Sequence, residues 1–456
     1  MILKSAIVSL TSKLEVDQAV FFSILSKIWG LVAGPISALM IVFFFSSDIQ
    51  GYYYTFGTIL ALQVFIELGL GLVTQQFISH EWSKLSFDSK NDIVGDENSL
   101  SRLISIARIS FKWFSIGAII ATVGLVFGGY IFFYKSQVIN VEWKLPWIFL
   151  CFTTGVTIVL TPIWSILEGC NQVKQVYRFR FFQGIILSIT VWVSITLGAL
   201  LWTGFIANVV SLICIFFFLY KKYWHFLKVL AFKKISGQEV NWKHDMLPMQ
   251  WKIAVSWISG YFCSSLITPV LFKYQGPEIA GQFGMTWGIV GMIVGIAASW
   301  ISPKAPKIAI LVAQKKYKEL DKFFFKIVRI IFIISFSTSL FIWIIILLLN
   351  KINFPPAQHF AARLISPLPV ALLLIAQLFL IISTPFSVYM RAHKQEPGMY
   401  LSVAAGIMIG ISTLILGKYY SVIGVSIGYL CTHIIIVPLV FLIWYRKHKI
   451  WTSVSF

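Results

Sequence analysis

The chain has 456 residues, of which 58% are hydrophobic and only 12% are charged. Its mean hydropathy is +0.84, and its 37 Lys and Arg against 17 Asp and Glu give a net charge of +20. A soluble core stops growing at roughly 250–300 residues, so this apolar mass has to face something other than water. An ordinary soluble enzyme, a disordered chain and a secreted disulfide scaffold are therefore excluded. Membrane topology explains the excess of cations better than nucleic-acid binding does, and we expect no nucleic-acid partner.

Twelve apolar stretches are long enough to form membrane-spanning helices. A hydrocarbon core of about 30 Å needs roughly 20 apolar residues per helix. The strands of a membrane barrel would be about half as long and would alternate in polarity, which these stretches do not. The predicted spans are approximately residues 20–45, 52–78, 110–134, 146–168, 179–198, 200–220, 252–271, 280–301, 324–349, 364–390, 397–416 and 421–445. Because acidic residues precede the first stretch and no small-residue cleavage site follows it, we expect a retained helix there and not a signal peptide.

The positions of Lys and Arg predict how the spans are oriented. If the loops alternate and the N-terminus is cytoplasmic, 30 of the 37 Lys and Arg residues lie on the cytoplasmic side and six on the other, with Lys27 inside the first span. This bias predicts that both termini are cytoplasmic. A basic segment at 221–250 follows the sixth span. The predicted domains are therefore an N-lobe at 1–220, a cytoplasmic linker at 221–250 and a C-lobe at 251–456.

A motif near the end of the fourth span recurs near the end of the tenth. The repeated pairs, each 223 positions apart, are Thr161/Thr384, Pro162/Pro385, Gln172/Gln395 and Tyr177/Tyr400. A weaker echo relates the segment at Gly51, which opens the second span, to the segment at Gly281, which opens the eighth. Transporter folds are often built from such repeats. Since six spans per half start both halves on one side, we predict an all-α membrane fold of two six-helix lobes related by a pseudo-twofold axis along the membrane normal.

Polar residues follow single helix faces in several spans. In the fourth span, spacings of three and four residues place a stripe on one face, made of Thr154, Thr157, Thr161, Ser165, Glu168 and Gln172. Gln63 and Glu67 share a face of the second span. Such stripes either join helices or face a water-filled cavity. Glu67 lies about fifteen residues into its span, where an unpaired acid costs about 2.5–3.5 kcal/mol, and this favours a functional role.

The other charges near the spans leave two readings open. Lys27 lies near the inner end of its span, where snorkelling of the side chain explains it as well as a function does. Glu168 and Arg391 occupy equivalent positions of the repeat, and they are either a cytoplasmic gate pair or separate interfacial charges. The five cysteines form no CxxC pair and the seven histidines no HExxH spacing, so we expect no metal site and no catalytic residues.

Three groups of short motifs together resemble one known family. They are Glu67-Leu68-Gly69-Leu70 with the Gly51 segment, Leu167-Glu168-Gly169-Cys170-Asn171-Gln172 after the fourth span, and Arg391-Ala392-His393-Lys394-Gln395-Glu396-Pro397 after the tenth. They are similar to motifs of the Wzx-type polysaccharide-unit flippases (O-antigen or capsule flippases) of the multidrug/oligosaccharidyl-lipid/polysaccharide exporter superfamily. The twelve-span plan covers the whole chain, whereas the motifs are short and only moderately specific.

The resemblance implies two lobes around a central cavity in a bacterial inner membrane. The cargo would be an undecaprenyl-diphosphate-linked oligosaccharide used in lipopolysaccharide (O-antigen) or other polysaccharide biosynthesis. It would move from the cytoplasmic to the outer leaflet by alternating access, beside membrane lipids and the polymerase and chain-length proteins of the same pathway. The diphosphate would bind Lys27 and Arg391, Glu67 would couple transport to H⁺ or Na⁺ without a resident cofactor, and other cavity residues would contact the cargo: Gln63, Thr154, Thr161, Tyr52 and Trp257.

Two other functions share this architecture. A cation-coupled multidrug exporter of the same superfamily predicts deep acids and few cations, which fits Glu67 but not Lys27 or Arg391. A membrane enzyme of the same glycan pathway predicts a large outer loop with clustered polar residues, whereas the outer loops here are short and nearly uncharged. We therefore expect a transporter and not an enzyme.

Overall fold

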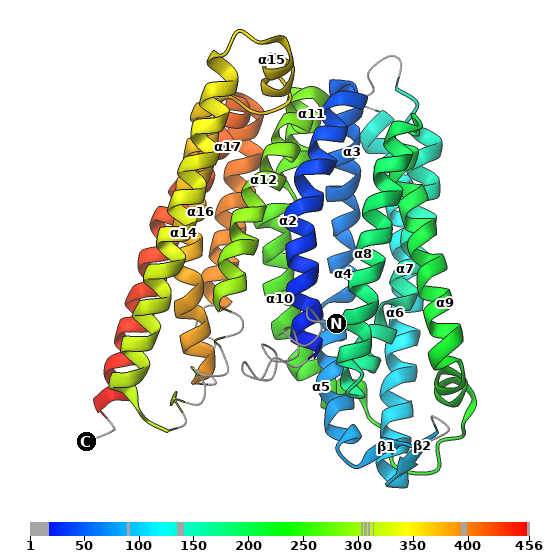
Figure 1. Ribbon diagram of the computed structural model, residues 1–456. Coiled ribbons are helices and arrows are strands. Elements are labelled where there is room, and N and C mark those ends of the chain that lie inside the picture. The colour runs from blue at the N-terminus through cyan, green and yellow to red at the C-terminus, as the bar shows by residue number, and fades with distance from the viewer. Residues whose placement is uncertain are drawn as a thin grey trace, which may run out of the picture. The chain divides into compact units, whose positions relative to one another are not determined.

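The computed structural model of the chain is almost entirely helical, with the helices of each compact unit running alongside one another (Figure 1). It describes residues 18–88, 92–134, 141–301, 304, 308, 311–312, 314–393 and 399–453. Residues 394–397 of the predicted motif after the tenth span lie outside this part of the chain. Ten of the described helices are long and apolar enough to cross a membrane, and a bent helix pair, Ser47–Glu67 with Leu70–Trp82, makes an eleventh.

The eleventh and twelfth predicted spans lie together in one long helical element. The helix α17 (Met399–Ser453) contains Ser421 with φ 53° and ψ −144°, a conformation that no helix permits, so two helices meet there. Every predicted span therefore has a counterpart among the described residues, and the chain is a multi-pass membrane protein. Helices suit this setting because they satisfy their own backbone hydrogen bonds where no water is present.

The chain divides into two compact units. Unit 1 comprises Met1–Met40, Leu62–Phe133 and Glu142–Trp257, and unit 2 comprises Ile41–Ala61, Tyr134–Val141 and Ile258–Phe456. The units change over at Trp257, and the segment Ile41–Ala61, which includes the first ten residues of the predicted second span, belongs to the unit formed mainly by the second half of the chain. This division differs from the predicted lobes in these two respects and in the short segment Tyr134–Val141, which belongs to unit 2. The helix α9 also continues to Phe232, so the predicted linker at 221–250 begins inside a helix.

Unit 1 consists of nine helical elements, the beginning of a tenth, and one hairpin among the described residues. Their bounds are α2 (Gln18–Phe44), η1 (Ala61–Gln63), α4 (Val64–Glu67), α5 (Leu70–Trp82), β1 (Leu85–Phe87), β2 (Ile93–Gly95), α6 (Glu97–Tyr134), α7 (Lys144–Gly169), α8 (Val173–Thr196), α9 (Trp202–Phe232), η2 (Trp242–Met246) and the beginning of α10 (Leu247–Ser264). The two strands pair antiparallel, with Leu85 opposite Gly95. Asp96 caps the start of α6 by accepting a hydrogen bond from the Ser99 backbone N–H at 2.8 Å.

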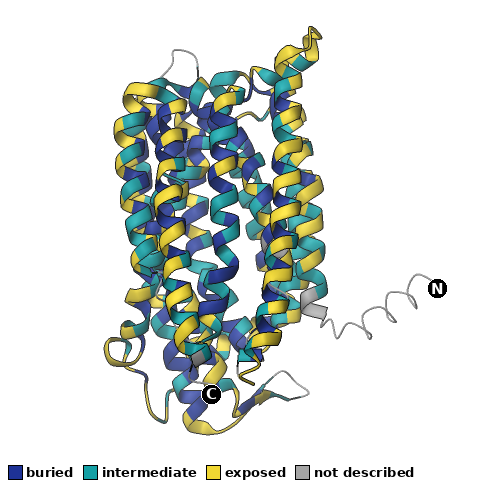
Figure 2. Ribbon diagram, turned by 90° about the vertical axis from the view of Figure 1, so that its left-hand side faces the viewer, coloured by how far each residue is buried: buried dark blue, intermediate teal, exposed yellow. Residues whose placement is uncertain are grey.

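Unit 2 contains the remaining helices of the described chain. They are α3 (Ser47–Leu60), the end of α10, α11 (Ile267–Gln275), α12 (Pro277–Ile301), α14 (Tyr317–Lys351), α15 (Pro355–Ala361), α16 (Pro367–Ala392) and α17. Buried and exposed residues alternate along the same helices (Figure 2), as expected for helices with one face toward protein and one toward lipid.

The predicted repeat reappears in the bounds of the helices. The first residues of α7 and α16, Lys144 and Pro367, lie 223 positions apart, and so do their last residues, Gly169 and Ala392. The left-handed Ser421 in α17 also follows Gly198, which has φ +75° in the turn between α8 and α9, by 223 positions. The constant offset therefore extends from the fourth to the sixth span of each half.

Within unit 2, a buried arginine between α15 and α16 contacts α3 and the residue that follows α2. Arg363 is only 7% exposed, donates to the Phe45 carbonyl and lies 3.5 Å from Gln50 Oε1. Gln50 Nε2 in turn donates to the Gly281 carbonyl at 2.9 Å. Gly51 and Gly281, the two ends of the weaker sequence echo, pack against each other: a Cβ at Gly281 would lie 2.8 Å from the Gly51 nitrogen. Glycine at these positions is therefore required by close helix packing.

Candidate functional site

The second span is broken beside its carboxylate. Glu67 is the last residue of α4, and the next two residues, Leu68 (φ 43°) and Gly69 (φ 69°), are left-handed. The helix direction changes by 46° between Ser47–Glu67 and Leu70–Trp82. Non-helical backbone at membrane depth persists only where it is buried in protein or lines a water-filled cavity. The predicted span at 52–78 is therefore formed by two helices with a bend between them, which the prediction did not include because hydropathy does not register a change of backbone conformation.

Neighbouring helices of unit 1 hold the break in place. A Cβ at Gly69 would lie 2.8 Å from Ile253 Cβ of α10 and nearer still to its Cγ2, so only glycine fits. The Ile66 carbonyl accepts a hydrogen bond from Trp113 Nε1 of α6 at 2.8 Å. This bond satisfies a carbonyl next to the interrupted helix, which would otherwise lack a partner in hydrocarbon. The Trp113 ring lies 5.3 Å from that of Trp242. The break is therefore held by specific packing and hydrogen bonding, in which Ile253, Trp113 and Trp242 take part.

Glu67 is only partly exposed at this break and makes no hydrogen bond or salt bridge with the described residues. Its backbone ends a half-helix, whose last carbonyls carry partial negative charge. Gln63, one turn earlier, is also half-buried and lies on the same face. A carboxylate beside the negative end of a half-helix favours uptake of a proton or a small cation. The position is therefore suited to ion coupling.

The predicted polar stripe of the fourth span lies on α7, where its threonines bond mainly to their own helix. Thr154 donates to the Leu150 carbonyl at 2.8 Å, and Thr161 donates to the Thr157 carbonyl at 3.2 Å. Thr154 is 6% exposed and also accepts from Asn208 Nδ2 of α9 at 3.2 Å. These contacts are those of helix packing. Thr161 remains half-buried, whereas Thr154 is enclosed by protein.

Glu168 has a partner that the sequence did not indicate. Arg180 Nη2 of α8 lies 3.1 Å from Glu168 Oε1. The same guanidinium lies over the rings of Trp164 and Tyr177, at 5.6 and 5.7 Å from their centroids. An arginine held between an acid and two aromatic rings fixes the turn between α7 and α8. Glu168 belongs to unit 1 and Arg391 to unit 2, so the predicted gate between them stays a prediction.

Lys27 is exposed on α2, about 9 Å along the helix from the start of the apolar span at Phe21. The opposite face of α2 contacts α8: Trp29 Nε1 donates to Ser188 Oγ at 3.1 Å, and Trp192 Nε1 donates to Ser37 Oγ at 2.9 Å. Lys27 lies about 160° around the helix from Trp29. It makes no hydrogen bond or salt bridge to any residue that the structure describes.

The two aromatic candidates have different surroundings. Tyr52 has no exposed surface, and its ring packs edge-on against Phe272 of α11 at 4.9 Å. The expected contact of Tyr52 with the cargo is therefore corrected: the ring belongs to the core of unit 2. Trp257 is 37% exposed on α10, and Arg391 is exposed in the last turn of α16. Both remain accessible for binding.

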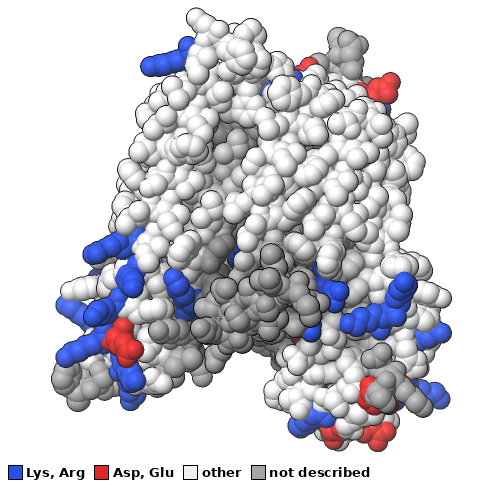
Figure 3. Space-filling model, in the orientation of Figure 1, with Lys and Arg blue, Asp and Glu red and all other residues white. Residues whose placement is uncertain are grey.

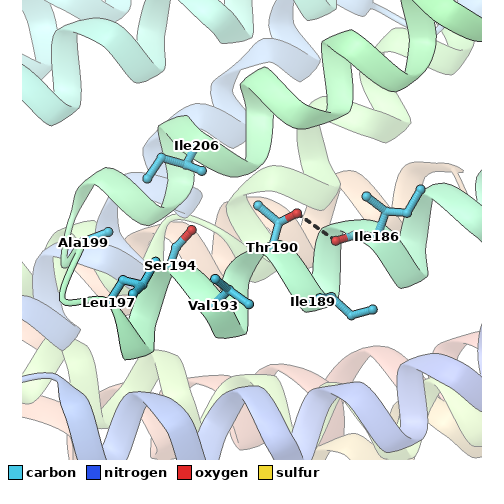
Figure 4. Close-up of a pocket in the computed structure, with 8 residues that line it drawn as sticks. All are labelled: Ile186, Ile189, Thr190, Val193, Ser194, Leu197, Ala199 and Ile206. Atoms are coloured by element: carbon cyan, nitrogen blue, oxygen red, sulfur yellow. Dashed lines mark hydrogen bonds between the residues drawn. The ribbon is translucent and has the colours of Figure 1, made fainter.

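An apolar pocket of about 530 Å³ lies in unit 1 at the end of α8 and the start of α9 (Figure 4). It is lined by Ile186, Ile189, Thr190, Val193, Ser194, Leu197, Ala199 and Ile206. The Thr190 hydroxyl is used within its own helix, donating to the Ile186 carbonyl at 2.8 Å. With no charged group in its lining, this pocket suits a hydrocarbon chain and not a phosphate.

Sequence reasoning missed three residues that shape these sites: Gly69, Trp113 and Arg180. The glycines at 69 and 71 in mid-span were a signal for the break. No sequence pattern pairs Trp113 with Ile66 or Arg180 with Glu168, because these contacts are made between helices. Among the described residues, no group of three or more His, Cys, Asp or Glu side chains could hold a metal ion.

No protein-family model matches the sequence, and no curated protein matches it either. Solved structures do match over nearly the whole chain. One is a multidrug-resistance MATE-family transporter of the MOP superfamily in an inward-facing conformation, with a TM-score of 0.64, 14% identity, and coverage of 93% of this chain and 96% of that chain. Another is the lipid II flippase MurJ in an inward closed conformation, with a TM-score of 0.57, 14% identity, and coverage of 95% and 90%.

A third match is a MOP-superfamily transporter from Pyrococcus furiosus, described as having a binding pocket of reverse polarity. Its TM-score is 0.54 at 15% identity, and the match covers 95% of this chain and 96% of that one. At these identities the likeness establishes the fold alone. The chain therefore has the fold of MOP-superfamily transporters, which confirms the predicted fold class, and the structures it resembles are transporters and flippases.

Proposed function

We propose that the chain is a flippase for an undecaprenyl-diphosphate-linked oligosaccharide in a bacterial inner membrane. The observation that carries the proposal is Lys27, a cation within the first span that is exposed and has no hydrogen-bond or salt-bridge partner among the described residues. A cation at this depth favours a cargo that brings its own negative charge, and a diphosphate brings about two. The lipid II flippase among the structural neighbours supports a lipid-linked cargo by analogy of fold.

In this account the parts of the cargo meet different residues. The diphosphate binds Lys27, and Arg391 provides a second cation. Gln63, Thr161 and Trp257 are the exposed or half-buried candidates for contacts with sugars. The hydrocarbon tail stays in the bilayer. Glu67 takes up H⁺ or Na⁺ at the helix break, and the neutralised carboxyl changes the stability of the bent second span during alternating access. The pathway's polymerase and chain-length proteins would receive the translocated unit.

Cation-coupled multidrug export is the second candidate. Glu67 favours it, since a deep carboxylate also attracts cationic drugs, and multidrug transporters are among the structural neighbours. The two functions differ in the charge of the cargo. Lys27 repels a cationic drug and attracts a phosphate, which is why we place flipping first.

A deletion strain of the native host separates the two functions. We expect loss of surface glycan, accumulation of the lipid-linked oligosaccharide in the cell and unchanged drug susceptibility, with recovery on expression of the full chain. Lys27→Gln should fail to restore the glycan at normal protein levels, whereas Lys27→Arg should restore it. Normal surface glycan together with increased drug susceptibility would favour export and overturn the proposal.

A further inference from the structure

Four cations form a stripe along the first three turns of α14. Lys318, Lys322, Lys326 and Arg329 follow one another at spacings of four, four and three residues, and all four are exposed. At 100° per residue they lie within an arc of about 80°. The stripe rises about 16 Å along the helix from Lys318 to Arg329. Figure 3 shows Lys and Arg side chains gathered around the region where α14 begins.

The stripe faces away from the protein core of unit 2. The buried residues of this part of α14 are Leu320, Phe324, Ile327 and Ile331. They are centred about 175° around the helix from the cations. Further along α14, the outward face continues with exposed apolar side chains, since Ile333 is 54%, Phe336 47% and Leu340 43% exposed. A single helix face therefore presents cations first and then an apolar surface.

No acidic side chain neutralises this stripe within the described residues. Asp321, which lies between the cations in sequence, instead contacts His448 Nε2 at 2.9 Å and accepts from the Tyr389 hydroxyl at 3.1 Å. Glu319 is exposed and forms no salt bridge with a described residue. The four cations make no hydrogen bond or salt bridge with the part of the chain that the structure describes. Their charge is therefore available to an external anion.

A fifth cation reinforces the stripe. Lys304, which follows α12, lies over the ring of Trp300 at 4.8 Å from its centroid. Partial burial and the neighbouring positive charge of Lys326 lower the pKa of Lys304 below its ordinary value. Two neighbouring like charges repel each other, and an anion beside them offsets this repulsion. The pair thus favours an anionic ligand at this level of the stripe.

We propose that this stripe binds anionic phospholipids of the leaflet in which α14 begins, with their phosphates on the cations and their acyl chains along Ile333, Phe336 and Leu340. The headgroup region of one leaflet is only about 5–8 Å thick, so the stripe of cations, about 16 Å long, extends beyond it. Arg329 and Lys326 thereby draw phosphates against the helix where exposed apolar residues begin. Charge complementarity and the outward direction of the face identify bilayer lipid as the occupant.

Native mass spectrometry of the full-length protein in micelles with equimolar phosphatidylglycerol and phosphatidylcholine tests the proposal. We expect preferential retention of phosphatidylglycerol. Because a cation near an anionic surface contributes about five-fold in affinity, the triple variant Lys322→Gln, Lys326→Gln and Arg329→Gln should lose at least about ten-fold of that preference. The variant with Lys322→Arg and Lys326→Arg should keep it.

The control has the same change of net charge between α9 and α10, in the loop after α9 and in η2: Lys233→Gln, Lys234→Gln and Lys243→Gln, all of them exposed. It should retain the lipid preference. Equal loss in both triple variants would show that net charge alone selects the lipid, and no loss in the stripe variant would show that the stripe does not bind it. Either result overturns the proposal. So would a stripe variant that loses only added undecaprenyl diphosphate and still retains phosphatidylglycerol.

Discussion

Replacement of Gly69 by alanine tests whether the broken second span is specified by its backbone. A residue with a Cβ in the left-handed conformation costs about 1–2 kcal/mol. The new methyl group would also lie 2.8 Å from Ile253 Cβ, an overpacking that typically costs about 1–3 kcal/mol. Together these effects predict a destabilisation of roughly 2–5 kcal/mol. The assay is thermal unfolding of the purified full-length chain in one detergent.

Two variants separate the contributions. Gly117→Ala adds a methyl group against the Ile66 side chain from a regular helix, so it gains about 1 kcal/mol of helix propensity and has no left-handed strain. It should be clearly less destabilising than Gly69→Ala. Ile253→Ala combined with Gly69→Ala should relieve the overpacking but not the strain, giving a favourable coupling of about 1–3 kcal/mol. Equal stability of Gly69→Ala and Gly117→Ala, or no coupling with Ile253→Ala, would refute this reasoning.

Two further predictions concern unit 2. Replacement of Arg363 by methionine should lower the unfolding temperature, because charge-assisted hydrogen bonds of about 1.5–3 kcal/mol are lost from a buried site. The unfolding temperature of Arg363→Lys should lie between those of Arg363→Met and the wild type. An unchanged unfolding temperature of Arg363→Met would show that the buried hydrogen bonds of Arg363 do not stabilise unit 2. Burial lowers the pKa of His393 below its ordinary 6.5. The hydrogen bond to the Tyr389 carbonyl raises this pKa by a smaller amount, and the nearby His448 lowers it further. The unfolded chain therefore binds a proton first as the pH falls through 6.5, and stability should decrease below that value. Melting curves at about pH 7.5 and about pH 5.5 should show a larger decrease for the wild type than for His393→Asn, and equal decreases would show that His393 is not the group responsible.

The course of the chain through the membrane could be predicted because it depends on the lengths of apolar stretches. Each of the twelve predicted stretches overlaps a helix, and the offset of 223 residues between Thr161 and Thr384 recurs in the bounds of α7 and α16. These features are local, or periodic along the chain, and a single sequence carries them.

The glycines at 69 and 71 were a signal for the break, but the backbone conformation adopted there and the pairing of charges depend on contacts between helices, so they could not be predicted. By hydropathy the segment Glu67-Leu68-Gly69-Leu70 belongs to one continuous span, although Gly69 permits a left-handed turn. The alternative conformation is selected by the close approach of Ile253 and by the hydrogen bond from Trp113. In the same way, the guanidinium beside Glu168 belongs to Arg180 of the next helix, α8. Helical periodicity relates only residues of one helix, so it does not predict this pair.

The assignment of Tyr52 shows a related difficulty. Aromatic residues at the end of a span suit a sugar-binding mouth, an interfacial belt and a protein core equally well. Tyr52 became a core residue because the glycines at 51 and 281 allow α3 and α12 to approach closely, which encloses its ring against α11. The sequence motif at Gly51 was therefore a packing signal and not a binding signal.

The most direct test of the account is transbilayer movement of the cargo by the purified chain. Liposomes containing the protein and a fluorescent undecaprenyl-diphosphate-linked oligosaccharide would be given a pH or Na⁺ gradient, and an added glycosidase would report the fraction of glycan exposed on the outside. We predict faster exposure with the wild type than in protein-free liposomes and little acceleration with Glu67→Gln. Exposure at the protein-free rate with the folded wild-type chain, under either gradient, would contradict the assignment of a flippase.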